Sequence, residues 1–168
     1  TYYAGIDLGR ADDYTVLSII NQKGELVFCD RWRHNTWQNI INEVVKVLKQ
    51  YNAKALIEIN SIGDVVYEQM LKLYPNVKPF VTTSKSKQDI VEGLQVAVQN
   101  NSFSLIDLDW LKKEFNVFTY EYNPKTRNIK DSAPSGFHDD GVMSCFIAYQ
   151  CYKEFKSKGE FNYMMGRV

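Results

Sequence analysis

The sequence predicts a single α/β domain, in which a mixed β-sheet carries helices on both faces. Its 168 residues are enough for one core of ordinary size, strand-like segments come first, and strands then alternate with helices. A hydrophobic content of 45% with 14% aromatic residues is typical of a globular chain. We therefore expect one domain over residues 1–168. Because the chain opens inside a strand without a methionine, we also expect it to be excised from a longer protein.

Three successive strands are predicted in the first part of the chain. The segments YYAGIDL at 2–8, YTVLSII at 14–20 and ELVFCDR at 25–31 are rich in β-branched and aromatic residues. NQKG at 21–24 has the composition of a turn. Short connections of this kind join antiparallel neighbours, so two consecutive hairpins are expected.

Helices and strands alternate in the rest of the chain. From Thr36 to Tyr51 the apolar residues recur at helical spacing, and Thr36 is a plausible N-cap. The expected elements that follow are a strand, a helix, a strand, a helix, a short strand, a helix, a hairpin and a closing helix, at 54–59, 63–74, 77–82, 85–100, 103–106, 108–116, 117–133 and 138–156. Three antiparallel strands followed by helix-linked parallel strands form the ribonuclease H-like pattern.

Charge and cysteine content narrow the function only slightly. Lys+Arg and Asp+Glu balance at 20 each, so the net charge does not indicate a nucleic-acid partner. Since no run approaches the roughly 18–20 apolar residues of a membrane span, we expect no membrane association. Cys29, Cys145 and Cys151 lack metal-ligand spacing and are expected to be buried free thiols.

Acidic residues lie where two predicted strands end and where the last helix begins. Asp7 ends the first strand in GIDLG, Glu58 ends the fourth in ALIEI, and Asp139 and Asp140 open the last helix in HDDGVM. If the first and fourth strands are neighbours, Asp7 and Glu58 emerge side by side at the carboxyl edge of the sheet. Carboxylates so close repel each other unless a cation lies between them. Oxygen ligands favour Mg²⁺ or Mn²⁺, and two such ions would hydrolyse a nucleic-acid backbone.

Each acidic residue also has a plainer interpretation. Glu58 taken alone is more often a solvated turn residue, and aspartates before a helix are most often caps. One of Asp139 and Asp140 is expected to cap the helix while the other faces the metals. Asp7 is hardest to explain otherwise, because its neighbours are apolar. We expect the two glycines of GIDLG to leave space around it for the metals and a DNA phosphate.

Three segments carry a resemblance to a known family. GIDLGRADDYTVLSII, ALIEINSIGDVVYEQML and GFHDDGVMSCFIAYQ resemble, in order and in spacing, the nuclease domain of the large subunit of phage DNA-packaging terminases. The resemblance covers essentially the whole chain, although GIDLG alone is shared with sugar kinases and actin-like ATPases. It implies a ribonuclease H-like fold and a two-metal endonuclease that cuts concatemeric viral DNA when packaging starts and ends.

The resemblance also implies partners and a location. It implies an ATPase domain earlier in the same polypeptide, with this chain as the C-terminal nuclease domain. A portal protein and a small terminase subunit would be further partners, and double-stranded DNA the substrate, in the cytoplasm of the host cell. We expect the isolated domain to be monomeric.

Carried over residue by residue, the resemblance implies metal ligands. These are Asp7, Glu58 and one of Asp139 and Asp140, with Asp140 favoured as the direct ligand. Asp13, in ADDYTV, matches an acidic position that the family often has near the site. It is expected to support the ligands or to act as an auxiliary one.

Polar neighbours of the acids have two interpretations each. His138 would orient a ligand or move a proton, and a solvent-facing cap is an equal alternative. Asn60 and Ser61, just past Glu58, would hydrogen-bond a phosphate or simply form a turn.

Basic residues in two segments are candidates for contacts with the DNA backbone. Lys85 and Lys87 lie in TTSKSKQD, after a predicted strand, and Lys125, Arg127 and Lys130 lie in NPKTRNIK, on the predicted hairpin. The alternative is that they only keep exposed loops soluble. The hairpin would act as a mobile flap over DNA. Because nothing in it suggests base reading, we expect low sequence specificity.

Other functions stay open at the level of the sequence. A resolvase- or transposase-like nuclease of the same fold would use the same acids. A sugar-kinase or actin-like ATPase would need a second glycine-rich phosphate loop, and neither that nor GxxxxGK[ST] occurs in the chain. A non-catalytic docking module would give Glu58 and Asp140 no reason to meet Asp7.

Overall fold

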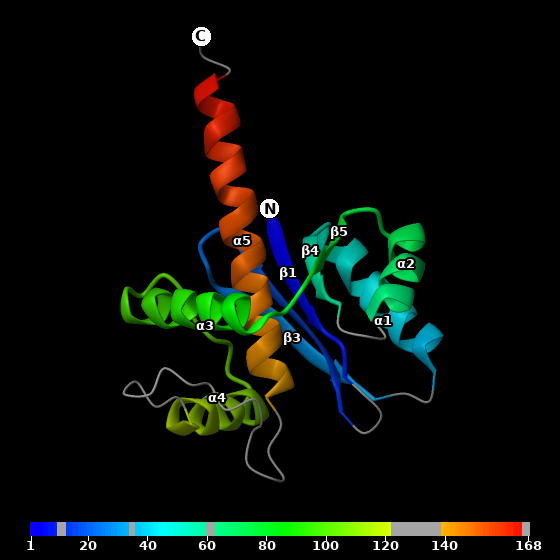
Figure 1. The fold of residues 1–168 in the computed structure, drawn as a ribbon, viewed down its shortest axis with the longest axis horizontal. Coiled ribbons are helices and arrows are strands. Elements are labelled where there is room, and N and C mark those ends of the chain that lie inside the picture. The colour runs from blue at the N-terminus through cyan, green and yellow to red at the C-terminus, as the bar shows by residue number, and fades with distance from the viewer. Residues whose placement is uncertain (10–12, 34–35, 60–62, 122–138, 166–168) are drawn as a thin grey trace.

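The computed structural model describes residues 1–9, 13–33, 36–59, 63–121 and 139–165, and it is organised around a five-stranded mixed sheet (Figure 1). The strands are β1 (Tyr2–Asp7), β2 (Thr15–Asn21), β3 (Leu26–Trp32), β4 (Lys54–Glu58) and β5 (Val77–Phe80). Their order across the sheet is β3-β2-β1-β4-β5. The pairs β1–β2 and β2–β3 are antiparallel, whereas β1–β4 and β4–β5 are parallel. This confirms the predicted ribonuclease H-like sheet.

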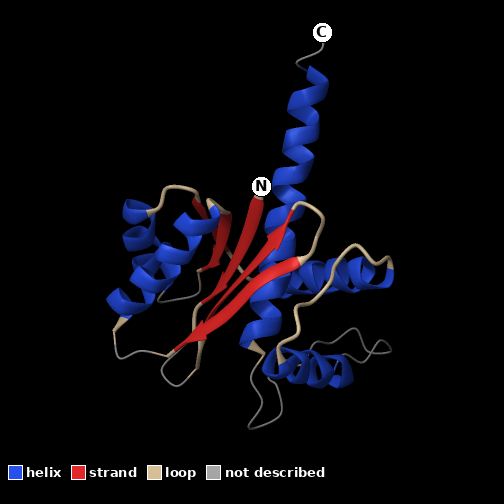
Figure 2. Ribbon diagram, turned by 180° about the vertical axis from the view of Figure 1, so that it is seen from behind, coloured by secondary structure: helices blue, strands red, loops and turns tan. Residues whose placement is uncertain are grey.

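Helices cover both faces of the sheet. On one face lie α1 (Trp37–Tyr51) and α2 (Gly63–Leu73), and on the other lie α3 (Ser84–Gln99), α4 (Asp109–Glu121) and α5 (Asp140–Met165), as Figures 1 and 2 show. Successive side chains of a strand point to opposite faces. Accordingly, Ala4 and Ile6 of β1 belong to the apolar cluster under α1 and α2, while Tyr3 belongs to the cluster under α5. The domain therefore has two apolar cores separated by the sheet.

Helix α5 lies unusually close to the central strand. A Cβ atom placed on Gly5 of β1 would be 2.2 Å from the backbone nitrogen of Ala148 and 2.2 Å from the backbone oxygen of Ser144. Any other residue at this position would push the helix off the strand. The glycine thus lets the backbone of α5 rest on the backbone of β1.

Local signals explain where α1 begins and ends. The hydroxyl of Thr36 accepts the backbone N–H of Asn39 at 3.4 Å, so the predicted N-cap is confirmed. Asn52 closes the helix in the left-handed conformation, with φ 47°, and donates its N–H to the carbonyls of Leu48 and Lys49.

The predicted hairpin at 117–133 is wrong for its first residues. Residues 117–121 belong to α4, and residues 122–133 lie outside those that the structure describes. Phe115 and Phe118 both meet Phe146 of α5 edge to face, with ring centroids 6.5 and 5.2 Å apart. These contacts continue the apolar stripe of α4 beyond residue 116.

Three smaller expectations were also tested. The strand predicted at 103–106 is reduced to one bridge, between Glu25 and Ser104. The last helix, predicted to end at 156, continues to Met165. All three cysteines are buried and free, as expected. None of the helices, over the residues described, is long and apolar enough to span a membrane.

Candidate metal centre

Two carboxyl groups meet where the central parallel strands end. Ile6 of β1 is paired with Ile57 of β4, so Asp7 and Glu58 follow at the same level of the sheet. Asp7 is only 8% exposed, and Glu58 is half-buried. Burial raises the pKa of Asp7 well above its ordinary value, and a hydrogen bond with Glu58 and the charge of Glu58 raise the pKa further. The predicted meeting of these two acids at one edge of the sheet is therefore seen.

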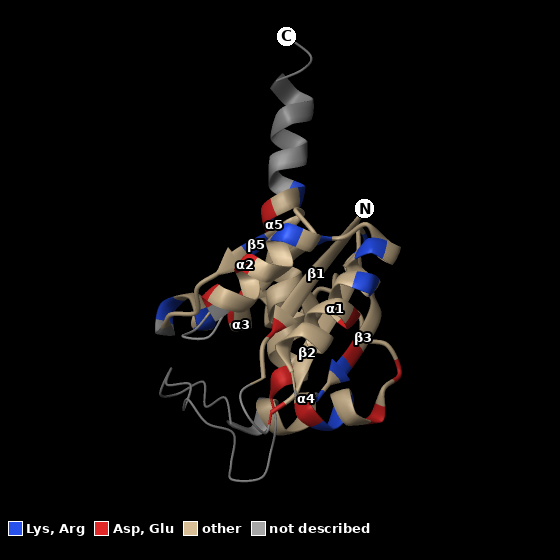
Figure 3. Cartoon of the chain, turned by 90° about the vertical axis from the view of Figure 1, so that its right-hand side faces the viewer, with Lys and Arg blue, Asp and Glu red and all other residues tan. Residues whose placement is uncertain are grey.

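The start of α5 brings two more acids towards Asp7. The charges of Asp140 and, to a smaller extent, Asp139 also raise the pKa of Asp7. The carbonyl of Asp139 accepts the N–H of Met143 at 2.9 Å, as in a helix N-cap residue. The Oδ2 atom of Asp140 accepts the backbone N–H of Tyr14 at 3.4 Å. Figure 3 shows acidic segments gathered around this end of the sheet.

This donor set fits a hard divalent cation. Two carboxylates cannot hydrogen-bond each other without a shared proton, and a cation is the other means of neutralising them in a buried place. The donors are all oxygen atoms, which Mg²⁺ and Mn²⁺ prefer. Within the described residues, no three His, Cys, Asp or Glu side chains already form a closed metal-binding cluster. The acids are thus brought to one edge, and their carboxylates would have to turn towards an ion there.

A fifth acid, Glu114 of α4, lies beside this group. Its side chain is 9% exposed, and its Oε2 atom accepts the N–H of Gly141 at 2.8 Å. The pKa of Glu114 is raised to about 7, chiefly by burial and also by the charge of Asp140, while hydrogen bonds from the backbone of Gly141 and Val142 and the charge of Arg31 act in the opposite direction. The Nη1 atom of Arg31 is 3.8 Å from Oε1 of Glu114.

Arg31 is held between two aromatic rings. Its guanidinium carbon is 4.4 Å from the ring centroid of Tyr14 and 4.4 Å from that of Trp110. Sequence reasoning missed both Arg31 and Glu114. One signal was available, because Glu114 falls on the apolar stripe of α4, next to Phe115 and four residues after Trp110, where a charged residue is unusual.

The remaining predicted residues divide into two groups. Asp13 is exposed and lies just before β2, while Lys85 and Lys87 lie in the first turn of α3 rather than in a loop. The other predicted residues lie outside the part of the chain that the structure describes: Asn60, Ser61, Lys125, Arg127, Lys130 and His138.

The two glycines of GIDLG do not leave space for ligands, so that prediction is wrong. The position of a Gly5 side chain is filled by the backbone of α5. A Cβ atom on Gly9 would lie 2.5 Å from the carbonyl carbon of Tyr14 and 2.6 Å from the backbone oxygen of Asp13. Both glycines instead allow backbones to pass close to each other.

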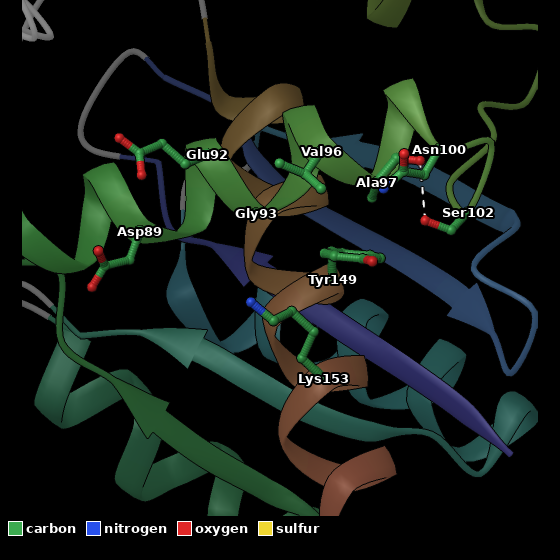
Figure 4. Close-up of a pocket in the computed structure, with 9 residues that line it drawn as sticks. All are labelled: Asp89, Glu92, Gly93, Val96, Ala97, Asn100, Ser102, Tyr149 and Lys153. Atoms are coloured by element: carbon green, nitrogen blue, oxygen red, sulfur yellow. Dashed lines mark hydrogen bonds between the residues drawn. The ribbon is translucent and has the colours of Figure 1, made fainter.

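A separate pocket of about 560 Å³ lies between α3 and α5 (Figure 4). Its lining includes Tyr149 and Lys153 of α5 and Glu92 and Val96 of α3. None of the acids described above lines this pocket. The candidate metal centre is therefore the edge of the sheet and not this hollow.

Comparison with known proteins agrees with the resemblance predicted from the sequence. No family model matches the chain. It is 25% identical over 155 residues to the terminase large subunit of Thermus virus P23-45 and 24% identical to that of Thermus phage G20c. Each alignment covers 90% of this chain but 32% of the relative, so the chain spans about a third of the length of these relatives.

Solved structures share the fold. The large terminase nuclease of thermophilic phage G20c superposes with a TM-score of 0.77 at 23% identity, over 89% of this chain and 81% of that one. The same nuclease with bound magnesium gives 0.78 at 23% identity, over 89% and 80%. The nuclease domain of Thermus phage P74-26 gives 0.72 at 23% identity, over 88% and 77%. The predicted likeness to large terminase nuclease domains is confirmed in sequence and in fold.

Proposed function

We propose that this chain is a divalent-metal-dependent endonuclease domain that cuts double-stranded viral DNA during genome packaging. The observation that carries the proposal is Asp7, a buried carboxyl at the end of the central strand, beside Glu58 and the start of α5. The fold, shared with large terminase nucleases, supports the same conclusion. A structure of one of those nucleases contains bound magnesium, which supports Mg²⁺ or Mn²⁺ here.

Asp7, Glu58 and Asp140 would hold the ions, with Asp139 as the cap of α5. The chemistry that two divalent ions supply is the activation of a water and the stabilisation of the departing oxygen of a phosphodiester. Asp7 is held by the sheet itself, which fixes its place relative to Glu58. Asp140 is held by α5 and by the N–H of Tyr14.

The role in packaging rests on the relatives rather than on the site. Since both are named terminase large subunit and are about three times longer, the intact protein would add an ATPase domain before this one. A portal protein, a small terminase subunit and the host cytoplasm belong to the same proposal. A resolvase-like nuclease would use the same acids, and the relatives favour the terminase interpretation over it.

The proposal is tested by cleavage of supercoiled plasmid by the purified chain with Mn²⁺ or Mg²⁺. We expect Asp7→Ala and Glu58→Ala to lower the rate at least about 100-fold, because each removes a metal ligand. Asp140→Asn should lower it far more than Asp139→Asn. Glu43→Gln, on the exposed side of α1, is the matched control and should cleave like the unchanged chain.

Nicking that needs no metal, or that survives Asp7→Ala, would contradict the proposed function. Equal loss in Asp139→Asn and Asp140→Asn would contradict only the choice of Asp140 as ligand.

A further inference from the structure

Glu114 contacts the start of α5 although it comes from a different helix. Its Oε2 atom accepts the N–H of Gly141, the residue that follows Asp140, at 2.8 Å. The first N–H groups of a helix have no partner within the helix and need an outside acceptor. Glu114 is therefore an acceptor for the N-terminus of α5 that is supplied by α4.

Gly141 allows α4 to come this close. A Cβ atom on it would lie 2.6 Å from Cζ3 of Trp110, 2.7 Å from Oε2 of Glu114 and 2.8 Å from Cδ1 of Leu111. All three atoms belong to α4 side chains, so α4 rests directly on the first turn of α5. Glu114 was not among the acids predicted from the sequence. The contact between α4 and α5 is not purely apolar, since it includes the carboxylate of Glu114.

Arg31 of β3 connects Glu114 and Trp110 of α4 to the sheet. Its guanidinium lies between the rings of Tyr14 and Trp110 and 3.8 Å from Glu114. The backbone N–H of Tyr14 in turn donates to the carboxylate of Asp140 at 3.4 Å. The network thus reaches Asp140 twice, once at its carboxylate and once at the N–H of the next residue.

An acid in the first turn of a helix is itself a good acceptor for the free N–H groups there. As the cap residue, Asp139 is the usual acceptor for the N–H of Gly141, and Asp140 is the other acid on the same turn. If Glu114 did not accept this N–H, the first turn of α5 would draw one of these carboxylates back onto its own helix and away from Asp7. Glu114 removes this competition by accepting the N–H itself, and it holds the backbone next to Asp140.

Building on the proposed function, we propose that Glu114 and Arg31 are positioning residues that hold the first turn of α5 where the carboxylate of Asp140 can reach the metal centre. They do not contact the metal or DNA in this role. Groups that orient metal ligands typically change metal affinity or activity by about 10- to 100-fold when they are removed. The inference therefore predicts a loss of metal affinity from a residue that is not a ligand.

The test is direct binding of Mn²⁺, followed by the electron paramagnetic resonance signal of the free ion, together with thermal unfolding without metal. Glu114→Ala should weaken Mn²⁺ binding about 10- to 100-fold. Glu114→Gln should restore most of the affinity, because its amide oxygen can still accept the N–H of Gly141. Arg31→Lys keeps the charge but loses the planar stack, and it should weaken binding less than Glu114→Ala. Glu43→Gln should bind as the unchanged chain does.

Three results would overturn the inference. One is Mn²⁺ affinity in Glu114→Ala equal to that of the unchanged chain. The second is a loss that only follows the unfolded fraction in the metal-free melting curve. The third is a Glu114→Gln variant that binds Mn²⁺ no better than Glu114→Ala. If Glu114→Ala does not fold, a folded Glu114→Gln that binds Mn²⁺ at least about tenfold more weakly than the unchanged chain overturns the inference in its place. Failure of the proposed function would give a different result. In that case the unchanged chain would bind no Mn²⁺, or Asp7→Ala would bind Mn²⁺ as well as the unchanged chain does.

Discussion

The two faces of the sheet bury different kinds of side chains. Under α1 and α2 the core is a cluster of apolar, mostly aliphatic side chains, with Ile41, Val44 and Leu48 of α1 fully buried against the sheet. The face under α5 also contains buried polar groups, among them Ser18 and Ser144, whose hydroxyls are 2.6 Å apart. The acids lie at the end of this second face.

The difference shows how closely the candidate site depends on α5. Ser144 also donates a hydrogen bond to the carbonyl of Gly141 at 2.9 Å, and Gly5 lets the helix touch β1. The position of α5 therefore decides where Asp140 lies relative to Asp7. Changes on the face under α1 should alter stability alone, whereas changes on the α5 face should alter metal binding as well.

The largest combined effect, on the free energy of unfolding and on Mn²⁺ affinity together, is expected from Gly5→Ala. Its methyl group would collide with two backbone atoms of α5 at 2.2 Å, which neither side can avoid without moving the helix. We expect a loss of about 3 kcal/mol or more and weaker Mn²⁺ binding by the molecules that still fold. Urea unfolding and Mn²⁺ titration measure the two effects. As a control, Ala4→Gly, one residue away on the other face, should leave Mn²⁺ affinity unchanged. Unchanged Mn²⁺ affinity in Gly5→Ala would contradict the claim that the α5 face sets metal binding.

A cavity under α1 should separate stability from metal binding. Leu48 is fully buried, so Leu48→Ala should cost about 2–5 kcal/mol of unfolding free energy. Mn²⁺ affinity, measured at a temperature where the variant is folded, should stay within about twofold of the unchanged chain, because binding is a local property of the other face. A tenfold loss would show that the two faces are coupled.

Asp7→Asn should stabilise the metal-free chain at neutral pH while abolishing Mn²⁺ binding. The pKa of Asp7 is raised in the fold from an ordinary value of 3.8, so the stability that this carboxyl contributes is fully present below pH 3.8 and is lost as the pH rises through the raised pKa. An asparagine has no such loss. The melting temperature of the variant should therefore exceed that of the unchanged chain by an amount that grows with pH, at about 2–4 °C for each kcal/mol. A difference that shrinks as the pH rises would contradict the assigned shift.

The smallest effect is expected from Ser18→Ala. Ser18 has three partners, the hydroxyl of Ser144 and the thiols of Cys29 and Cys145, the last two at 3.3 Å. Since Ser144 keeps its bond to Gly141, the loss should be about 1 kcal/mol, with Mn²⁺ affinity changed by less than about tenfold. Chemical denaturation and Mn²⁺ titration would detect both changes. A larger loss of affinity would mean that Ser18 itself sets the position of α5.

Sequence reasoning could place the strands and the acids because both follow from local patterns. Runs of apolar residues predicted the strands β1 and β4. Because these two strands pair in parallel, Asp7 and Glu58 at their ends lie side by side. The same reasoning failed at residues 117–121, where alternating polar and aromatic residues looked like a strand. Contacts of Phe115 and Phe118 with α5 decide that segment in favour of a helix.

The network around Glu114 could not be predicted in this way. Its bond to Gly141 joins residues 27 positions apart on two helices whose packing no local pattern specifies. The stack of Arg31 between Tyr14 and Trp110 likewise joins the sheet to α4. Such contacts depend on how elements pack, whereas the ends of strands depend only on their own sequence and their neighbours.

The central claim is that the acids around Asp7 bind a divalent cation, and a crystal of the chain grown with Mn²⁺ tests it most directly. The account predicts an anomalous peak with carboxylate oxygens of Asp7, Glu58 and Asp140 around it, at about 2.1 Å as for small divalent ions in oxygen sites. An ion bound elsewhere, with the carboxyls of Asp7 and Glu58 still hydrogen-bonded to each other, would contradict it.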